Sequence, residues 1–192
     1  MENLLVLNNL GSEELFEYIK SIEITENPKE TPHLLKTPEI RVFGKVCKQN
    51  RNVGFFSNKS KGYAYSRQIM KSQKLPPILE KLLEDINKRF GTNFNGILIN
   101  HYRDGTDYIG KHRDNEKGLD TNKKAVASIS FGAQRKFRIR NNEGKIVKDI
   151  ETEHGMFMMM YNDFQEKYTH EIPVQKKIKE PRWSITFRYH RE

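Results

Sequence analysis

Residues 124–161 read KAVASISFGAQRKFRIRNNEGKIVKDIETEHGMFMMMY, and their pattern is the clearest indication of the fold. It holds four short segments rich in β-branched, aromatic or methionine residues, and glycines or polar turns separate them. Such spacing is typical of an antiparallel all-β domain. Seven short strands in all, with turns between them, predict a sandwich or a jelly roll. We expect these strands at 94–102, 124–132, 135–141, 145–151, 155–161, 169–174 and 182–190.

The chain before Gly91 has a helical pattern. Residues 11–20 predict a short helix with Ser12 as its N-cap. Residues 76–91 predict a longer helix, because prolines open it, apolar residues recur at helical spacing, and Gly91 follows its end. Helices followed by strands indicate an α+β fold, with helices on one face of the sheets.

The segment between the two predicted helices is less regular. Residues 24–40 hold three prolines and predict a loop or a sheet edge. Residues 40–56 alternate in polarity and carry Gly44 at a turn position, so we predict a hairpin. A short extended piece follows at 62–68. The whole length, 1–192, is that of a single domain with a sizeable core.

Charge and cysteine content narrow the class of protein. Lys plus Arg number 34 and Asp plus Glu 25, so the formal net charge is +9. This balance favours a nucleic-acid partner, although a basic surface alone also explains it. Cys47 is the only cysteine, so no intrachain disulfide forms, and a reducing compartment fits. The first ten residues are not those of a secretory signal. No apolar run approaches the roughly 18 residues of a membrane span.

His112 and Asp114 are the first candidates for chemistry. They lie two apart, so in an extended segment their side chains point to one side. With a second histidine they would form a two-His, one-carboxylate site that leaves positions open on non-haem Fe(II). His154, His170 and His190 are the downstream candidates for that third ligand. A solvent-exposed pair at a strand end is the alternative.

The segment RWSITFR, 182–188, is the second candidate. Alternation puts Arg182, Ser184, Thr186 and Arg188 on one face, and the apolar residues between them on the other. Two arginines inside a barrel need anions, and guanidinium binds carboxylate through two parallel hydrogen bonds. A solvated strand face is the alternative. Two polar residues, Asn100 and Tyr102, share one face of an earlier predicted strand.

Taken in order, these motifs resemble those of the AlkB family of Fe(II)/2-oxoglutarate dioxygenases. The resemblance rests on Asn100-x-Tyr102, His112-x-Asp114, His170 and Arg182-x5-Arg188, and it covers residues 40–190. Segments 126–140 and 153–173 resemble the core strands of the family. VFGK at 42–45 and YAYS at 63–66 resemble the branch that repairs alkylated bases in duplex DNA. The ordered set is specific, whereas each motif alone is not.

The resemblance implies a double-stranded β-helix, or jelly roll, with Fe(II) held by His112, Asp114 and His170. It implies that Asn100 and Arg188 hold the keto-acid end of 2-oxoglutarate, while Tyr102 and Arg182 hold the far carboxylate. Thr186 belongs to the same implied pocket. With O2 as the other cosubstrate, the implied reaction hydroxylates an N-alkyl group and releases succinate, carbon dioxide and formaldehyde.

The resemblance also implies how the base is recognised. It makes residues 39–75 a nucleotide-recognition lid, between an N-terminal helix and loop at 1–38 and the catalytic core at 76–192. The implied contacts to nucleic acid come from Phe43, Gly44, Lys45, Tyr63, Tyr65 and Glu116. Phe43 would be a wedge that fills the gap of a flipped base, Tyr65 would stack on the base, and Glu116 would recognise it. A buried strand residue is the alternative for Phe43, and a solvated acid is the alternative for Glu116.

Further basic residues are candidate phosphate contacts, and two positions depart from the family pattern. The candidates are Lys45, Lys48, Arg51 and the run at 176–179. Ser184 stands where the family usually has asparagine, and Asn115 where this branch often has an acid.

Three functions therefore follow from the sequence. The first is oxidative demethylation of bases such as 1-methyladenine and 3-methylcytosine, in double-stranded DNA by preference and in single strands also. The second is oxygenation of RNA or protein within the same superfamily. The third is non-catalytic binding of nucleic acid. We expect a monomer without membrane attachment, inside a cell: in the nucleus for a eukaryote or a virus of one, and in the cytoplasm otherwise.

Overall fold

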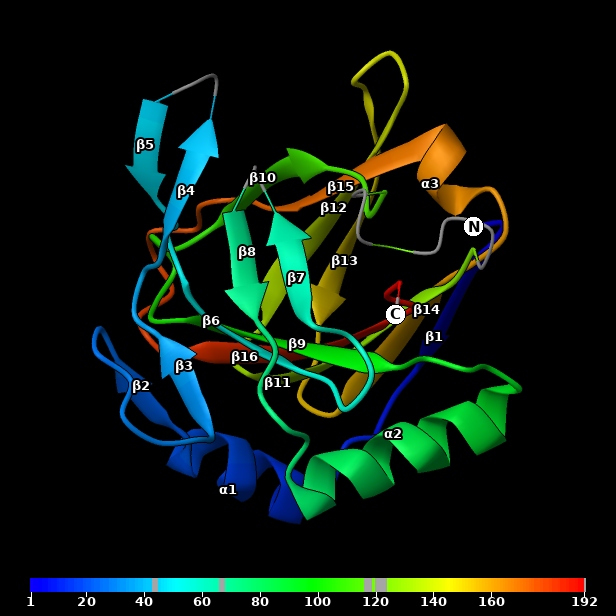
Figure 1. The fold of residues 1–192 in the computed structure, drawn as a ribbon. Helices are drawn as coiled ribbons and strands as arrows, with labels where there is room; N and C mark the ends of the chain where they lie inside the picture. The colour runs from blue at the N-terminus through cyan, green and yellow to red at the C-terminus, as the bar shows by residue number, and fades with distance from the viewer. Residues whose placement is uncertain (43–44, 66–67, 116–118, 120–123, 192) are drawn as a thin grey trace.

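The computed structural model describes residues 1–42, 45–65, 68–115, 119 and 124–191. Two sheets face each other, and the larger has eight strands (Figure 1). From edge to edge these are β1 (Leu4–Leu7), β14 (Met156–Met160), β11 (Val126–Gly132), β16 (Arg182–Arg188), β9 (Gly96–Tyr102), β6 (Asn52–Phe56), β3 (His33–Leu35) and β2 (Glu23–Thr25). The smaller sheet holds β10 (Ile109–His112), β15 (Tyr168–Ile172), β12 (Arg135–Asn141) and β13 (Ile146–Thr152).

The chain passes back and forth between the two sheets from β9 to β16. Strands β9, β11, β14 and β16 lie in the larger sheet, and β10, β12, β13 and β15 in the smaller one. Every pairing among these eight strands is antiparallel. Four strands in each of two facing sheets are consistent with a jelly-roll core. All seven strands expected from the sequence after Gly91 are confirmed.

Three helices complete the fold. They are α1 (Glu13–Ser21), α2 (Pro77–Phe90) and α3 (Phe164–Lys167). The Ser12 side chain accepts a hydrogen bond from the backbone N–H of Leu15, as expected of an N-cap. Gly91 ends α2 in the left-handed conformation, with φ 62°, which a residue with a Cβ adopts less readily. Because these helices are short, the chain is mostly β rather than α+β.

Helices α1 and α2 cover the outer face of the larger sheet, while the smaller sheet covers its inner face (Figure 1). Alternation along β16 decides which residues meet which layer. Ile185 and Phe187 point to the helices and are fully buried there. Burial of one such side chain contributes about 1.5–3 kcal/mol. Arg182, Thr186 and Arg188 point between the sheets, as the alternation predicted.

The methionine-rich strand β14 serves both cores. Met156, Met158 and Met160 fill the space between the sheets, and Phe157 packs against Phe90 of α2 with ring centroids 4.5 Å apart. Flexible methionine side chains fill irregular gaps in a core. The prediction of a buried strand here is confirmed.

The segment between the first two helices contributes more strands than expected. Part of 24–40 forms β2 and β3, which are the last two strands at one edge of the larger sheet, so the sheet-edge alternative for this segment is confirmed. Two antiparallel ribbons follow, β4 (Glu39–Val42) with β5 (Lys45–Lys48), and β7 (Gly62–Tyr65) with β8 (Gln68–Lys71). Both lie on the side of the larger sheet that faces away from α1 and α2 (Figure 1). No described helix is long and apolar enough to cross a membrane.

Candidate metal centre and anion pocket

An irregularity in the pairing of β10 with β15 aims His112 into the space between the sheets. Ile109 pairs with Ile172, and His112 pairs with His170. Three steps along β10 therefore match two steps along β15, so β10 carries one extra residue. In a regular ladder, side chains three apart would point to opposite faces. The bulge lets His112 face His170, and bulges beside active sites commonly re-aim a side chain in this way.

The His112 ring is prepared to give a lone pair to a cation. Its Nδ1 lies 2.8 Å from the backbone oxygen of Gly110. A carbonyl oxygen only accepts, so Nδ1 carries the proton and Nε2 is left with the lone pair. Burial, and then the nearby His170, lower the pKa of His112 to about 3. The ring is therefore neutral near pH 7, as metal ligation requires.

Asp114 supplies the negative charge of the cluster and is deeply buried. Its Oδ2 lies 3.3 Å from Nε2 of His170, and its Oδ1 lies 4.0 Å from Nε2 of His112. Burial alone would raise the pKa of this carboxyl, but the Arg188 guanidinium and His170 outweigh burial and hold the pKa below its usual range. The group is thus an ionised carboxylate and an anionic ligand.

One ligand atom from each of His112, Asp114 and His170 lies within 4.8 Å of the others, and in the described part of the chain no other such group occurs. Two imidazoles and one carboxylate gathered at one place fit the facial set that holds non-haem Fe(II) with positions open. The His170 ring stacks on Phe137 at 5.1 Å, which fixes its orientation. The other two candidate ligands lie elsewhere: His154 contacts Glu13 on α1, and His190 packs against Phe55.

Arg182 is a candidate anion-binding residue between the sheets, and its surroundings are called the candidate anion pocket. It is 3% exposed, and no salt bridge reaches it from the described residues. Its Nη2 donates to Ser130 Oγ at 2.9 Å, its Nε donates to Thr152 Oγ1 at 3.3 Å, and its guanidinium lies 5.2 Å from the Tyr102 ring centre. Nη1 is buried and has no hydrogen-bond partner among the described residues. A buried guanidinium with spare donors fits a carboxylate ligand.

The remaining residues of the expected cosubstrate pocket share that inner face. Tyr102 pairs with Arg182, and Asn100 pairs with Ser184 on the neighbouring strand. Thr186 is buried and lies on β16 between Ser184 and Arg188. Asn100 Oδ1 accepts a hydrogen bond of 2.7 Å from Arg51 Nε. Arg51 is only 5% exposed, so its expected role as a phosphate contact is wrong: it follows β5 into the fold and holds Asn100 instead.

The residues expected to contact nucleic acid are placed only in part. Phe43, Gly44 and Glu116 lie outside the described residues. Tyr63 and Tyr65 belong to the backbone of β7, and Lys45 opens the exposed strand β5 with Lys48 at its end.

Two residues near the centre escaped the sequence analysis. Arg135 is 1% exposed and makes hydrogen bonds to three loop carbonyls. Its inward direction could have been found from the sequence, because Arg135 alternates in phase with the inward Phe137 and Ile139 of β12. Gln165 of α3 accepts a hydrogen bond of 3.0 Å from the backbone N–H of Asp114. No sequence pattern marks that contact, because it joins positions on separate elements.

Comparison with known proteins agrees with this geometry. The sequence profile of the 2OG-Fe(II) oxygenase superfamily matches residues 3–188. The human DNA oxidative demethylase ALKBH2 is 32% identical over 157 residues, which cover 78% of this chain and 60% of that protein. Human alkB homolog 3, an alpha-ketoglutarate-dependent dioxygenase, is 32% identical over 136 residues, covering 66% of this chain and 47% of that protein. The chain thus spans 60% or less of these relatives.

Solved structures show the same fold at low sequence identity. The structure of OsALKBH1 superposes with a TM-score of 0.66 and covers 98% of each chain, at 12% identity. An oxidoreductase of the 2OG-Fe(II) oxygenase family from Burkholderia pseudomallei gives a TM-score of 0.61 at 14% identity, covering 99% of this chain and 86% of that one.

Proposed function

Because the chain belongs to the AlkB family of 2OG-Fe(II) oxygenases, we propose that it repairs DNA by removing alkyl groups from bases such as 1-methyladenine and 3-methylcytosine. The observation that carries this proposal is the cluster of His112, Asp114 and His170, in which Asp114 and His170 are buried, together with two buried arginines on β16. The similarity to ALKBH2, a DNA oxidative demethylase, supports the substrate class.

His112, Asp114 and His170 would hold the Fe(II) of the family, and 2-oxoglutarate is the cosubstrate. When bound, iron, 2-oxoglutarate and O2 together supply the oxidising power that hydroxylates the N-alkyl carbon, which then leaves as formaldehyde while succinate and carbon dioxide form. The protein supplies the neutral imidazole of His112, the imidazole of His170 and the carboxylate of Asp114, gathered between the two sheets.

In our proposal, different residues bind the two ends of 2-oxoglutarate. Arg182 and Tyr102 bind the far carboxylate, because Arg182 has a buried donor to spare. Arg188 and Asn100 bind the keto-acid end, because Arg188 already contacts the ligand Asp114. Thr186 lies on the same face between the two arginines and completes the pocket wall.

The substrate must reach iron at a buried centre, so a base in a duplex has to leave the stack. We assign its capture to the two ribbons β4–β5 and β7–β8, which stand apart from the sheets (Figure 1). Tyr65 would stack on the base, with Tyr63 beside it, and Phe43 and Gly44 would fill the gap in the duplex. Lys45 would contact phosphate, and Glu116 would bind the base. The net charge of +9 supports a polyanionic substrate.

Two other functions remain as alternatives. An RNA or protein oxygenase would use the same iron centre, and a non-catalytic binding module would need none of it. The complete ligand set argues against the binding module. DNA is favoured because the chain is similar over 78% of its length to a protein named as a DNA oxidative demethylase. Duplex DNA is favoured because residues 42–45 and 63–66 resemble the duplex-repair branch of the family.

A screen of methylated oligonucleotides tests the proposal. The protein, Fe(II) and 2-oxoglutarate are incubated with matched single- and double-stranded DNA and RNA that carry 1-methyladenine or 3-methylcytosine, and mass spectrometry follows loss of the methyl group. We expect the fastest loss from duplex DNA. Loss from RNA alone would assign the activity to RNA, and no loss from any oligonucleotide while 2-oxoglutarate is consumed would point to another substrate class.

A further inference from the structure

Arg135 ties together the two loops that enter and leave the iron-binding strands. Its Nη1 donates to the backbone oxygen of Asp104 at 2.9 Å, and its Nη2 donates to the backbone oxygens of Asp107 and Pro173, each at 2.8 Å. Asp104 and Asp107 lie in the loop before β10, and Pro173 follows β15 directly. The side chain is 1% exposed, so its guanidinium is turned to these backbone oxygens and away from solvent.

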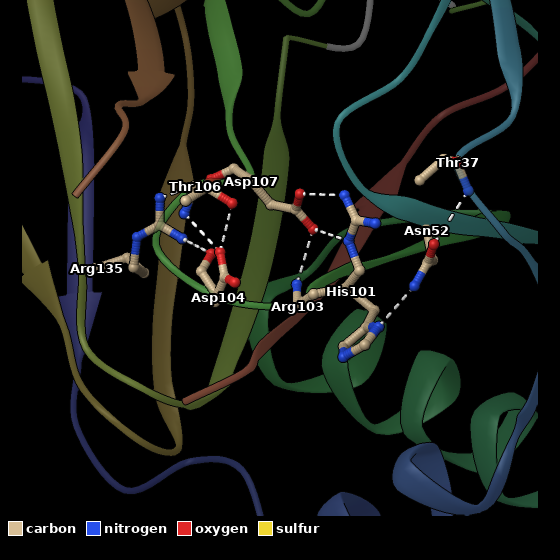
Figure 2. Close-up of polar contacts among 8 residues, drawn as sticks. All are labelled: Thr37, Asn52, His101, Arg103, Asp104, Thr106, Asp107 and Arg135. Atoms are coloured by element: carbon tan, nitrogen blue, oxygen red, sulfur yellow. Dashed lines mark hydrogen bonds and ion pairs between the residues drawn. The ribbon is translucent and has the colours of Figure 1, made fainter. Parts of the chain in front are cut away.

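The loop before β10 is itself rigidly built. Arg103 binds both carboxylate oxygens of Asp107, at 2.8 and 2.6 Å, and Asp104 accepts two hydrogen bonds from Thr106. Figure 2 shows Arg135 directed at the backbone of this loop, with Arg103 on the other side of Asp107. Arg135 therefore binds a loop whose conformation is already fixed by its own hydrogen bonds.

The two gripped loops also approach each other closely. The backbone N–H of Gln175 donates to the oxygen of Gly105 at 2.7 Å, and that of Gly105 donates to the oxygen of Ile178 at 2.9 Å. A Cβ at Gly105 would lie 1.9 Å from the Gln175 oxygen, so only glycine permits the approach. Gln175 Oε1 also accepts from Arg135 Nε at 3.4 Å.

The hydrogen bonds of Arg135 to the Asp104, Asp107 and Pro173 backbone oxygens, called the Arg135 clamp below, lie at one end of the β10·β15 ladder. Between Ile109–Ile172 and His112–His170 the β10·β15 ladder holds the bulge, so its register is not fixed by regular pairing. A shift of one residue would turn His112 away from His170. Arg135 holds the start of β10 against the end of β15, at the Ile109–Ile172 pair.

We propose that Arg135 is a positioning residue of the iron centre, which fixes the register of the bulged β10·β15 ladder and thereby keeps His112 facing His170. This inference rests on the iron site that the chain shares with its family and not on the proposed substrate. Outer residues that orient metal ligands commonly change metal affinity by about 10- to 100-fold when they are replaced.

Co(II) is the probe, because it binds such ligand sets without redox chemistry and its visible absorption reports coordination geometry. The test compares Arg135→Gln with the matched control Arg138→Gln, which lies on the same strand and loses only its outward pair with Asp149. We expect Arg135→Gln to bind Co(II) at least about tenfold more weakly, with an altered visible spectrum. Arg138→Gln should match the wild type.

A purely structural role for Arg135 gives a different pattern. Phe157→Leu, in the core beneath α2, serves as a variant that melts earlier without touching the clamp. If Arg135→Gln melts earlier as Phe157→Leu does, but binds Co(II) with wild-type affinity and spectrum, the proposal is overturned. If Arg135→Gln does not fold, Arg135→Lys decides. Lysine keeps the charge but cannot span three carbonyls, so we expect binding weakened several-fold. Wild-type binding by Arg135→Lys would overturn the proposal. No nucleic acid enters this test, so a failure of the proposed substrate leaves it unaffected.

Discussion

Arg188 Nη2 donates a hydrogen bond of 2.5 Å to Oδ1 of Asp114, so a buried arginine of β16 contacts the carboxylate of the candidate iron centre. The two residues lie 74 positions apart in the chain, and both are buried. The contact joins the place where iron binds to the place where the keto-acid end of the cosubstrate would bind. It leaves Oδ2 of Asp114 on the side of His170.

Arg188→Lys should raise the KM for 2-oxoglutarate and leave the affinity for DNA nearly unchanged. Lysine keeps the charge but loses the planar fork that matches a carboxylate. We expect a rise of about tenfold in KM, equivalent to about 1.4 kcal/mol. Steady-state kinetics and a DNA-binding titration on the same preparation measure the two effects. If DNA affinity collapses while KM holds, Arg188 contacts phosphate and the assigned pocket is misplaced.

Thr152→Val should weaken 2-oxoglutarate binding through Arg182. The Thr152 hydroxyl accepts from Arg182 Nε and Arg135 N–H, and donates to the Arg135 oxygen. Valine has a similar shape but leaves these buried N–H groups without an acceptor. The desolvation penalty of one such unpaired group is about 1–3 kcal/mol. Calorimetric titration of the Co(II)-loaded protein with 2-oxoglutarate measures the change. Thr152→Ser, which keeps the hydroxyl, is the control, and equal affinities in the two variants would contradict the assignment.

The metal-free protein should lose stability as the pH falls from 7 to 5. Burial lowers the pKa of His101 to about 4, and lowers the pKa values of His112 and His190 to about 3. An unfolded histidine has a pKa of about 6.5, so the unfolded state takes up protons first and unfolding becomes easier below that pH. Each histidine costs at most about 2 kcal/mol at pH 5 by this linkage.

Urea denaturation at several pH values measures this dependence. His101→Gln should flatten it by about one third, because one of the three histidines with a lowered pKa no longer titrates. In the native protein His101 Nδ1 accepts a hydrogen bond from Asn52 (Figure 2), a contact that glutamine is able to replace. Equal unfolding free energies at pH 5 and pH 7 in the native protein would show that these rings are not buried and neutral.

Phe43→Ala should reduce activity on a methylated duplex much more than on the same lesion in a single strand. A wedge acts only where a flipped base leaves a hole in a stack, and a single strand has no such hole. Val46→Ala is the matched control, because Val46 is apolar, is 53% exposed and lies on β5, three positions after Phe43 in the sequence. A core phenylalanine would instead cost about 3–5 kcal/mol of stability when truncated. Equal losses on both substrates, with an earlier melt, would identify Phe43 as a packing residue.

Much of the fold and of the centre follows from alternation along single strands. RWSITFR placed two arginines inward because neighbouring side chains on a strand face opposite ways, and the structure agrees. Strand β1 was missed, because its four residues are stabilised by pairing with the distant β14 rather than by a pattern of their own. The bulge before His112 was missed for a similar reason, since register belongs to two strands together.

The arginines show the same limit in two ways. Arg51 was read as exposed because charged residues usually are, yet its contact with Asn100 buries it. No role for Arg135 follows from the sequence, because the hydrogen-bond partners that define its role come from two loops elsewhere in the chain. Local patterns predict which face a side chain takes, whereas its partners depend on the folded chain.

The amounts of product formed from one lesion show whether this protein demethylates DNA. The protein is given Fe(II), 2-oxoglutarate and a duplex that carries one 1-methyladenine, and succinate, formaldehyde and unmodified adenine are measured together. We predict equal amounts of all three from the native protein and none from Asp114→Ala, which lacks the anionic ligand but keeps its fold by circular dichroism. Succinate without formaldehyde or adenine, or the same products from Asp114→Ala, would contradict the account.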